Sequence, residues 1–376
     1  EGSDLAYDTI LCRADSGSLI LEYTFAGEQP NILRVVWVGH EQEERHIGDF
    51  MVYSLHPDLF PLRPYKGDFH VHTCRSDGRE APAVAAANYR KAGFDFMAIT
   101  DHGQWEPSEE AISAYADVPV DLRIFHGEEV HPPENHVHMV NFGGKYSINR
   151  MFREYPECYR EEVGHIMEEM ESPEGVNAFE YASCVWCFDQ IRRAGGLGIF
   201  CHPHWIANAY HVPEKLVDLL FARMSFDAFE LLGGHESHSN NMQTAYYQEA
   251  RAAGKRIPIV GVSDSHGTVN APYFNWFYTI VFSADKKLEN IIEAVKNLQS
   301  VAVEQYPGET FRIYGPYRLV KYADFLLNEY FPLHDELCVE EGRLMKAYAC
   351  GDDSKTESLA RLRGHTGALL ERCFAG

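Results

Sequence analysis

The chain has 376 residues, which suggests about two domains, and its 33 Lys and Arg against 56 Asp and Glu give a formal net charge of −23. Clustered basic residues hold phosphate backbones, so this balance argues against a long nucleic-acid footprint. No apolar run approaches the ~18 residues of a spanning helix, the N-terminus lacks a basic and apolar leader, and the nine Cys are scattered, so we expect a cytoplasmic protein that does not enter a membrane.

Residues 1–65 are predicted to form a small β-rich domain. Three short runs, at 19–25, 32–38 and 50–55, are rich in β-branched and aromatic residues and are separated by Gly, Pro, Asn and charged residues. We expect an antiparallel layer or sandwich that packs without chemistry of its own.

Residues 66–304 alternate predicted strands with predicted helices. The helices are expected at 82–93, 151–195 and 241–255, and the strands at 67–73, 94–102, 123–130, 136–143, 196–205, 226–234 and 257–266. This alternation predicts an α/β fold with a parallel sheet, open or closed into a barrel. Within it, 145–190 is a large insertion, and 305–376 is expected to be a mainly helical C-terminal extension.

Histidine and acidic residues gather where these strands end. Fourteen of the 19 His lie between His70 and His266, and His70 and His72 are two apart, so both face one side of a strand. The other candidates at strand ends are Asp77, Asp101, His102, Glu128, Glu129, His136, His138, His202, His204, Asp264 and His266. Without cations, bringing so many ionisable groups together would cost several kcal/mol, so a multinuclear metal centre is predicted.

The series HVHT, SDG, TDH, GEEV, a strand His, HPH and SDSH resembles the PHP (polymerase and histidinol phosphatase) superfamily of metallophosphoesterases over residues 66–283. The approach YKGDFHVHT, with a β-rich segment before it, is similar to a stand-alone branch that includes carbamate-cleaving members. The resemblance implies a distorted (β/α)7 barrel that holds two or three divalent ions, and the oxygen and imidazole ligands suit Zn, Mn or Fe.

The resemblance also implies which residues bind each ion. The first ion would be held by His70, His72, Glu129 and Asp264, the second by Asp77, His102 and His266, and the third by Glu129, His138 and His202. Two alternatives stay open, Glu128 in place of Glu129 and His136 in place of His138. Asp77 stands where some relatives carry His, which affects the choice of metal more than the ability to bind one.

Three further residues are candidates for catalysis. Arg75 could clamp a phosphate or could belong to a surface ion pair. His204 could protonate the leaving group or support His202. Asp101, together with Asp68, is expected to orient ligand imidazoles rather than to bind metal.

Two other segments have chemical alternatives. CVWC (184–187) has the spacing of a zinc or redox motif, but no second pair lies nearby, so core packing is favoured. The segment 235–241 could contact substrate or could be a solvated turn. Residues after the HPH motif could line the pocket or pack in a loop: Trp205, Asn208, Tyr210 and His211.

These features predict an enzyme that hydrolyses a small phosphate ester, a phosphomonoester or a nucleotide-like phosphodiester, with a hydroxide activated by two or three divalent ions. One alternative is the same chemistry on a carbamate, amide or carboxylic ester, which the β-rich segment before the motifs favours. A second alternative is a metal-binding scaffold without activity. The expected partner is a small anionic substrate, with no long nucleic acid and no membrane, and the sequence predicts no oligomeric state.

Overall fold

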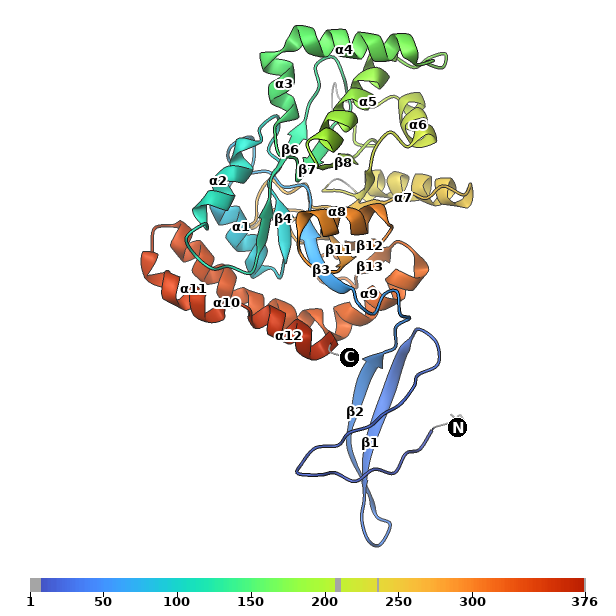
Figure 1. The fold of residues 1–376 in the computed structure, drawn as a ribbon, viewed down its shortest axis with the longest axis vertical. Coiled ribbons are helices and arrows are strands. Elements are labelled where there is room, and N and C mark those ends of the chain that lie inside the picture. Colours follow the sequence, from blue (N-terminus) through green and yellow to red (C-terminus); the bar gives the residue numbers. More distant parts are fainter. Residues whose placement is uncertain (1–7, 207–210, 235–236, 375–376) are drawn as a thin grey trace. The chain divides into compact units, whose positions relative to one another are not determined.

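The structure is a computed structural model that describes residues 8–206, 211–234 and 237–374 (Figure 1). The chain divides into two compact units between Phe60 and Pro61. The division falls a little before residue 65 because the strand that begins at Arg63 already belongs to a sheet of the second unit.

The first unit contains a two-stranded antiparallel ribbon, β1 (Pro30–Val38) and β2 (Glu44–Tyr53). Two of the three runs predicted to be strands, 32–38 and 50–55, lie wholly or mostly in this ribbon. The prediction of a strand at 19–25 is wrong. Among the described residues no strand pairs with this run and most of its side chains are exposed, so its β-branched and aromatic residues have no ladder partner.

The second unit has a mixed α/β fold built on two sheets. The six-stranded sheet has the order β13 (Arg312–Tyr314), β12 (Ser300–Glu304), β11 (Phe277–Ser283), β3 (Arg63–Asp68), β4 (Phe96–Ala98), β5 (Arg123–Phe125). The five-stranded sheet has the order β10 (Ile259–Gly261), β9 (Ala228–Leu232), β8 (Leu197–Phe200), β7 (Met139–Phe142), β6 (Gly127–Val130). Two isolated parallel bridges connect the sheets, Val71 with Ser265 and His102 with Glu129.

Helices flank these sheets, and those expected at 82–93, 151–195 and 241–255 are present with shifted ends. They are α1 (Pro82–Lys91), α2 (Glu106–Ala114), α3 (Ile148–Glu154), α4 (Pro156–Glu169), α5 (Ala178–Arg193), α6 (Glu214–Arg223), α7 (Ser237–Ala252), α8 (Leu288–Lys296), α9 (Tyr317–Glu329), α10 (Phe331–Ala349), α11 (Thr356–Leu362) and α12 (His365–Phe374). Within the second unit, α3–α6 gather at one end and α10–α12 lie at the opposite end (Figure 1). Across the described part of the chain, every helix is too short or too polar to cross a membrane.

The expectation of a parallel sheet needs correction at β7 and at β11–β13, because β11 pairs antiparallel with β3 and with β12, and β12 pairs antiparallel with β13. Strands β3–β4–β5 and β8–β9–β10 are parallel, but β7 runs antiparallel to both β6 and β8. No helix separates β6 from β7, and a short connection without a crossover reverses the chain direction. The run at 123–130 is also not one strand, because it passes from β5 into β6 and therefore from one sheet to the other. Because β7 is reversed, its first residue, Met139, lies beside the carboxyl ends of β6 and β8, at Val130 and Phe200.

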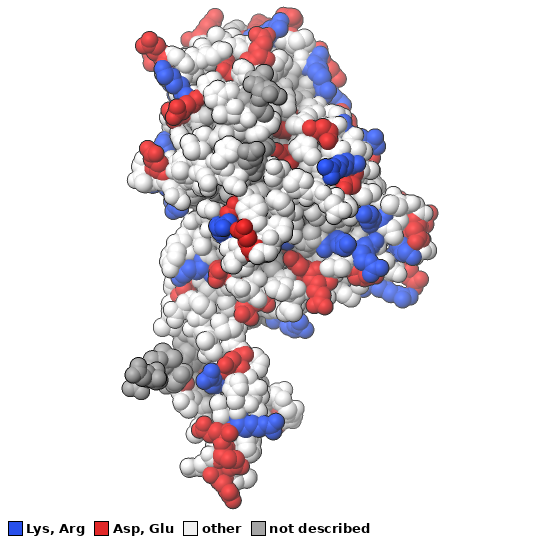
Figure 2. All heavy atoms as spheres, turned by 180° about the vertical axis from the view of Figure 1, so that it is seen from behind, with Lys and Arg blue, Asp and Glu red and all other residues white. Residues whose placement is uncertain are grey.

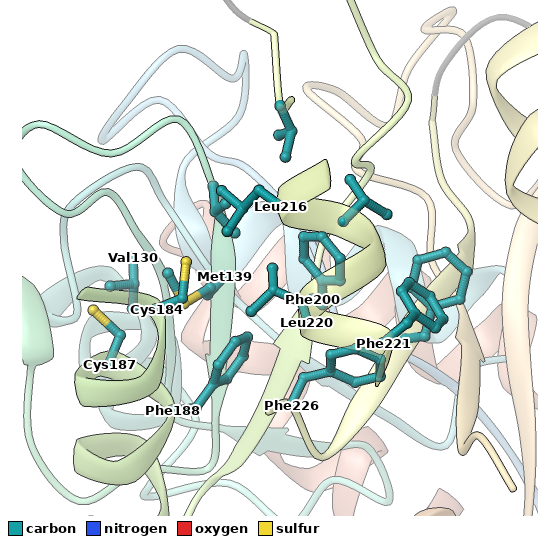
Figure 3. Packing of buried hydrophobic residues seen from close by; sticks show 14 of the residues in the cluster. Val130, Met139, Cys184, Cys187, Phe188, Phe200, Leu216, Leu220, Phe221 and Phe226 are labelled. Atoms are coloured by element: carbon teal, nitrogen blue, oxygen red, sulfur yellow. The ribbon is translucent and has the colours of Figure 1, made fainter. Parts of the chain in front are cut away.

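A large apolar cluster packs between the five-stranded sheet and helices α5 and α6 (Figure 3). Phe200 and Met139 from the sheet lie in this cluster with Cys184 and Cys187 from α5. Both cysteines are free and fully buried, and burial raises the pKa of Cys184 to about 12. The interpretation of CVWC as core packing is therefore confirmed.

Candidate metal centre

Glu129, the third residue of β6, lies at the centre of the cluster. Six imidazole nitrogens lie 2.5–3.6 Å from its carboxylate oxygens, and neither oxygen accepts a well-directed hydrogen bond within the described residues. The side chain is 1% exposed. A buried carboxylate with orphaned oxygens is costly, and coordination of a cation would remove that cost.

The first predicted ligand group comes from the segments that follow β3 and β10. The Nε2 atoms of His70 and His72 are 3.1 Å apart, and they lie 3.4 and 2.9 Å from Oδ1 of Asp264. Both nitrogens are 3.6 Å from Oε2 of Glu129. Ligand atoms about 2.1 Å from a tetrahedral ion lie roughly 3.4 Å from one another, so these four side chains fit around one ion.

The second predicted group lies beside the first. Oδ2 of Asp77 is 3.4 Å from Nε2 of His102 and 3.3 Å from Nε2 of His266. The ring of His72 lies against both imidazoles, with centroid distances of 4.2 and 4.3 Å. The spacing again matches the ligands of a single ion.

The third predicted group lies on the other oxygen of Glu129. Oε1 is 2.8 Å from Nδ1 of His138 and 3.4 Å from Nε2 of His202. His138 immediately precedes β7, so the reversal of that strand is what carries it to this position. The structure thus brings all nine predicted metal ligands into one cluster, and the residues fit the divalent ions that the motifs imply.

The two open alternatives differ clearly in their surroundings. Glu128 is buried on the opposite side of β6, where it accepts hydrogen bonds from Ser147, Asn149 and the backbone nitrogen at the start of α3. His136 is 54% exposed and pairs with Glu180, with Nδ1 2.8 Å from the carboxylate. Glu129 and His138 are therefore the members of each pair that face the cluster.

The electrostatics of the cluster follow from Glu129. Burial opposes its charge, but the imidazoles of His138 and His131 outweigh burial and hold the pKa of this carboxyl well below its usual range. Burial lowers the pKa of His138 to about 4. At His102 burial is outweighed by Glu129, which raises the pKa to about 9. Because a metal ligand must give up its proton, ions compete with protons at His102 more than at His138.

Two ligands hold an unusual backbone conformation. His202 has φ +25° and Asp264 has φ +46°, in the region that non-glycine residues rarely adopt. Such positions cost about 1–3 kcal/mol and persist where surrounding structure enforces them, commonly at functional sites. Both residues directly follow strands of the five-stranded sheet, and the bend aims their side chains at Glu129 and His72.

Asp68 and Asp101 accept hydrogen bonds from backbone and hydroxyl groups. Asp101 accepts hydrogen bonds from the backbone and side chains of Thr73 and Ser76, and so holds the loop that carries Asp77. Asp68 accepts from the backbone nitrogens of His70 and Ser263, at the start of two ligand segments. The expectation that they orient ligand rings stays a prediction, and the hydrogen bonds described here hold the segments that carry the ligands.

The remaining catalytic candidates, Arg75 and His204, have contacts with other side chains. Arg75 forms a two-point ion pair with Glu110, at 2.7 and 2.8 Å, on the surface. The ring of His204 lies 6.0 Å from that of Tyr246 on α7. These contacts add no support for the clamp and acid roles, which stay predictions.

The loop after β8 contributes one aromatic side chain to the cluster. The ring of Trp205 lies edge-on to His202 at 5.7 Å and 6.5 Å from His138. His211 is exposed, while Asn208 and Tyr210 lie outside the described residues. The segment 235–241 lies outside them at 235–236, and from 237 it forms the first turns of α7.

Sequence reasoning missed two residues that the structure places at the cluster. Glu230 on β9 is fully buried, and its Oε2 lies 3.0 Å from Nδ1 of His70. A carboxylate behind a ligand imidazole fixes which nitrogen faces the ion. In the sequence, the signal that could have identified Glu230 is its position as the acidic residue inside the otherwise apolar run FELL. His131 follows Glu129 by two residues, and this spacing is the signal in the sequence that could have identified it.

Comparisons with known proteins give limited likenesses. No protein-family model and no curated protein matches the chain. A two-domain protein from Bacteroides vulgatus containing a predicted PHP-like metal-dependent phosphoesterase is 16% identical, with a TM-score of 0.46 over 67% of this chain and 68% of that one.

Two other solved structures are less similar. A protein from Bifidobacterium adolescentis assigned as a metal-dependent phosphoesterase is 17% identical, with a TM-score of 0.38 over 56% of this chain and 92% of that one. An amidohydrolase from Chromobacterium violaceum, with bound sulfate and no metal, is also 17% identical, with a TM-score of 0.36 over 55% of this chain and 89% of that one. The order of the ligand motifs along the chain, and the His, Asp and Glu side chains that these motifs bring together, agree with the resemblance to the PHP superfamily seen in the sequence.

Proposed function

We propose that the protein is a metal-dependent hydrolase that cleaves a small phosphate ester, either a phosphomonoester or a nucleotide-like phosphodiester. The observation that carries this proposal is Glu129, buried at 1% exposure with six imidazole nitrogens within 3.6 Å. We further propose that the two sheets close into the family's distorted (β/α)7 barrel, which the bridges between Val71 and Ser265 and between His102 and Glu129 support.

The chain's own residues supply the geometry of the reaction. Two or three divalent ions bound at the three ligand groups would lower the pKa of a bound water and offset negative charge that develops on a phosphoryl oxygen. Glu129 is shared by the first and third groups, so it holds these two positions close together. Asp101 and Asp68 keep the loops before Asp77 and Asp264 in place.

A small anionic substrate is compatible with the acidic chain. On the face drawn in Figure 2, Lys and Arg side chains are interspersed with Asp and Glu. The field at a metal site is set mainly by the ions themselves and less by the net charge of −23. A small phosphate ester needs only that local field, whereas a long polyanion would need an extended basic surface.

The ion pair of Arg75 favours a second candidate function, hydrolysis at a carbonyl group. Arg75, the basic residue expected to bind phosphate, is engaged by Glu110. A site without an arginine clamp also suits a neutral carbonyl group, so the alternative is hydrolysis of a carbamate, amide or carboxylic ester by the same metal-activated hydroxide. The scaffold alternative is disfavoured because all nine ligand positions carry ligand-capable side chains.

The test combines elemental analysis with a substrate panel. We expect the purified protein to contain Zn, Mn or Fe, and to hydrolyse p-nitrophenyl phosphate or bis(p-nitrophenyl) phosphate faster than the matching acetate or carbamate. Asp264→Asn should abolish turnover and reduce bound metal, because it removes the negative charge of the carboxylate whose Oδ1 lies 2.9 Å from Nε2 of His72. Chelation should inactivate the protein, and added Mn or Zn should restore it.

The control is His165→Ala, an exposed position on α4 far from the ligand segments in the chain. It should keep both metal and activity. Faster turnover of the carbamate would establish the alternative function. Full activity in Asp264→Asn, or activity that survives exhaustive chelation with no metal detected, would refute the metal-dependent mechanism.

A further inference from the structure

His131 lies among the ligand side chains although no predicted ligand group includes it. Its Nε2 atom is 3.2 Å from Oε2 of Glu129 and 3.0 Å from Nδ1 of His102. These three atoms lie within 4.8 Å of one another, the arrangement expected of side chains around one ion.

The His102 ring faces two groups at once. Its Nε2 atom is 3.4 Å from Asp77, as the second ligand group requires. Its Nδ1 atom points the other way, 2.5 Å from Oε2 of Glu129. Binding to the Asp77 group therefore leaves one nitrogen of this ring directed at Glu129 and His131.

The position of His131 is held from both sides. Its backbone nitrogen donates to Oδ1 of Asn149 on α3, and Nδ2 of the same Asn149 donates to the backbone oxygen of Glu129. The His131 ring stacks on His138 with a centroid distance of 3.9 Å and an interplanar angle of 26°. These contacts orient the ring toward the cluster, which a solvated turn residue would not require.

We propose that His131, with Nδ1 of His102 and Oε2 of Glu129, forms a further divalent-ion position in the centre. With Nε2 of His102 on the ion of the Asp77 group, the His102 ring would bridge two ions as an imidazolate, and its remaining ring proton would be released to solvent. Two nitrogens and one oxygen suit Zn, Mn or Fe. The side chains of His102 and His131 are 32% and 35% exposed, whereas those of His70, His72 and Asp264 are 6% or less. Three protein ligands next to solvent leave room for water or a substrate oxygen, as in catalytic metal sites.

This position differs from the buried His70 group in its expected behaviour. Its ion is the more accessible one, so it exchanges first and is the first that a chelator removes. The inference rests on the proposed function, because it assumes that the centre binds divalent ions at all.

The test is metal binding by the chelated full-length protein, with Co²⁺ as the probe. His131→Ala should lose about one ion per chain and the weakest binding step in a calorimetric titration, and its Co²⁺ absorption should fall. His131→Asn, which keeps a polar side chain of similar size, should show the same loss if the alanine variant folds poorly. His136→Ala is the matched control, because it removes a nearby imidazole that pairs with Glu180 outside the cluster.

The outcomes separate this inference from the proposed function. If both His131 variants bind as many Co²⁺ ions as the unmodified protein, with equal affinities, His131 is not a ligand and only this inference falls. If the unmodified protein binds no divalent ion, the proposed function falls with it. A loss in His136→Ala equal to that in His131→Ala would assign the effect to the loop and would also overturn the inference.

Discussion

Glu129 shows how one residue organises the centre. Its two oxygens face different imidazoles, His138 and His202 on one side and His70, His72, His102 and His131 on the other. A charged, buried carboxylate is stable only when opposite charge is close, and imidazoles supply that charge through protons or through bound ions. Proton binding and metal binding are therefore competing ways of meeting the same electrostatic demand.

Glu230 contacts the imidazole of His70 on the side of the ring that faces away from the cluster. Because its carboxylate lies 3.0 Å from Nδ1 of His70, Nε2 of that ring is left to face the cluster. We expect Glu230→Gln to weaken metal binding about 10- to 100-fold, since the amide removes the charge that orients the ring and raises its basicity. The measurement is the dissociation constant for Co²⁺ or Zn²⁺ by calorimetry.

Glu180→Gln is the comparison for this variant. Glu180 also pairs with an imidazole, that of His136 at 2.8 Å, but this histidine lies outside the cluster. Its substitution should leave the dissociation constant unchanged. Equal affinities in Glu230→Gln and the unmodified protein would show that the contact with His70 does not support metal binding.

Among the secondary-structure elements, helices α1 and α10 pack closely because small residues line their contact. Ala85, Ala86 and Ala87 of α1 are buried. On α10, a Cβ added at Gly342 would lie 2.3 Å from the backbone nitrogen of Lys91 at the end of α1. The absence of a side chain at this glycine is what lets the C-terminal extension approach the helix that follows the first ligand motif.

Gly342→Ala should therefore destabilise the protein although alanine favours helices. The added methyl group must push backbone apart, and overpacking of this kind costs about 1–3 kcal/mol of unfolding free energy. Gly164→Ala on α4 is the matched control, since a Cβ there meets nothing within 4 Å. It should stabilise the helix by up to about 1 kcal/mol.

Chemical denaturation of both variants measures this difference. Opposite signs of the change in unfolding free energy would support close packing of α1 against α10. If Gly342→Ala were as stable as Gly164→Ala, the close contact with Lys91 would be refuted.

At the scale of the second unit, a buried charge network joins the C-terminal helices to the sheet. Arg90 on α1 is fully buried and bonds to Glu341 on α10 at 2.5 Å and to Thr366 on α12 at 3.1 Å. His334 on α10 lies 3.1 Å from Asp95, which directly precedes β4. The helices after residue 305 are thus an integral part of the unit that carries the metal centre.

The His334–Asp95 pair predicts how stability depends on pH. Burial opposes the charge of His334, but Asp95 outweighs it and raises the pKa of His334 well above its usual value, while His334 and nearby cations hold the pKa of Asp95 below its usual range. The stabilisation from His334 is complete below its unfolded pKa of about 6.5 and is lost as pH rises through the raised value. That from Asp95 is present above about 3.9 and is lost in acid.

His334→Asn should therefore cost about 3–5 kcal/mol near pH 5.5, where both groups are charged, and less at a pH above the raised pKa of His334. Denaturant unfolding of the chelated protein at the two pH values measures this, with His365→Asn as an exposed control. Equal costs at both pH values would contradict an ion pair and would indicate that His334 contributes through packing alone.

Residue types and their order were sufficient to single out nine of the side chains that the structure brings together, but not Glu230 or His131. Two His two residues apart next to an apolar run, as in HVHT, face one side of an extended backbone. The Ala-rich pattern at 82–93 and the apolar run before Thr100 were likewise readable as a helix and a strand. The run at 19–25 was predicted to be a strand and is not one, because β propensity alone does not supply a neighbouring strand to pair with.

Tertiary structure decided what depends on direction and on distant contacts. His138, and not His136, lies beside Glu129 at the start of the reversed strand β7, and Arg75 forms an ion pair with Glu110. Glu230 acquired its role only when β9 came to lie behind His70. Local patterns specify which chemical groups a segment presents, whereas their partners are set by strand pairing and packing between residues far apart in the chain, where no local pattern operates.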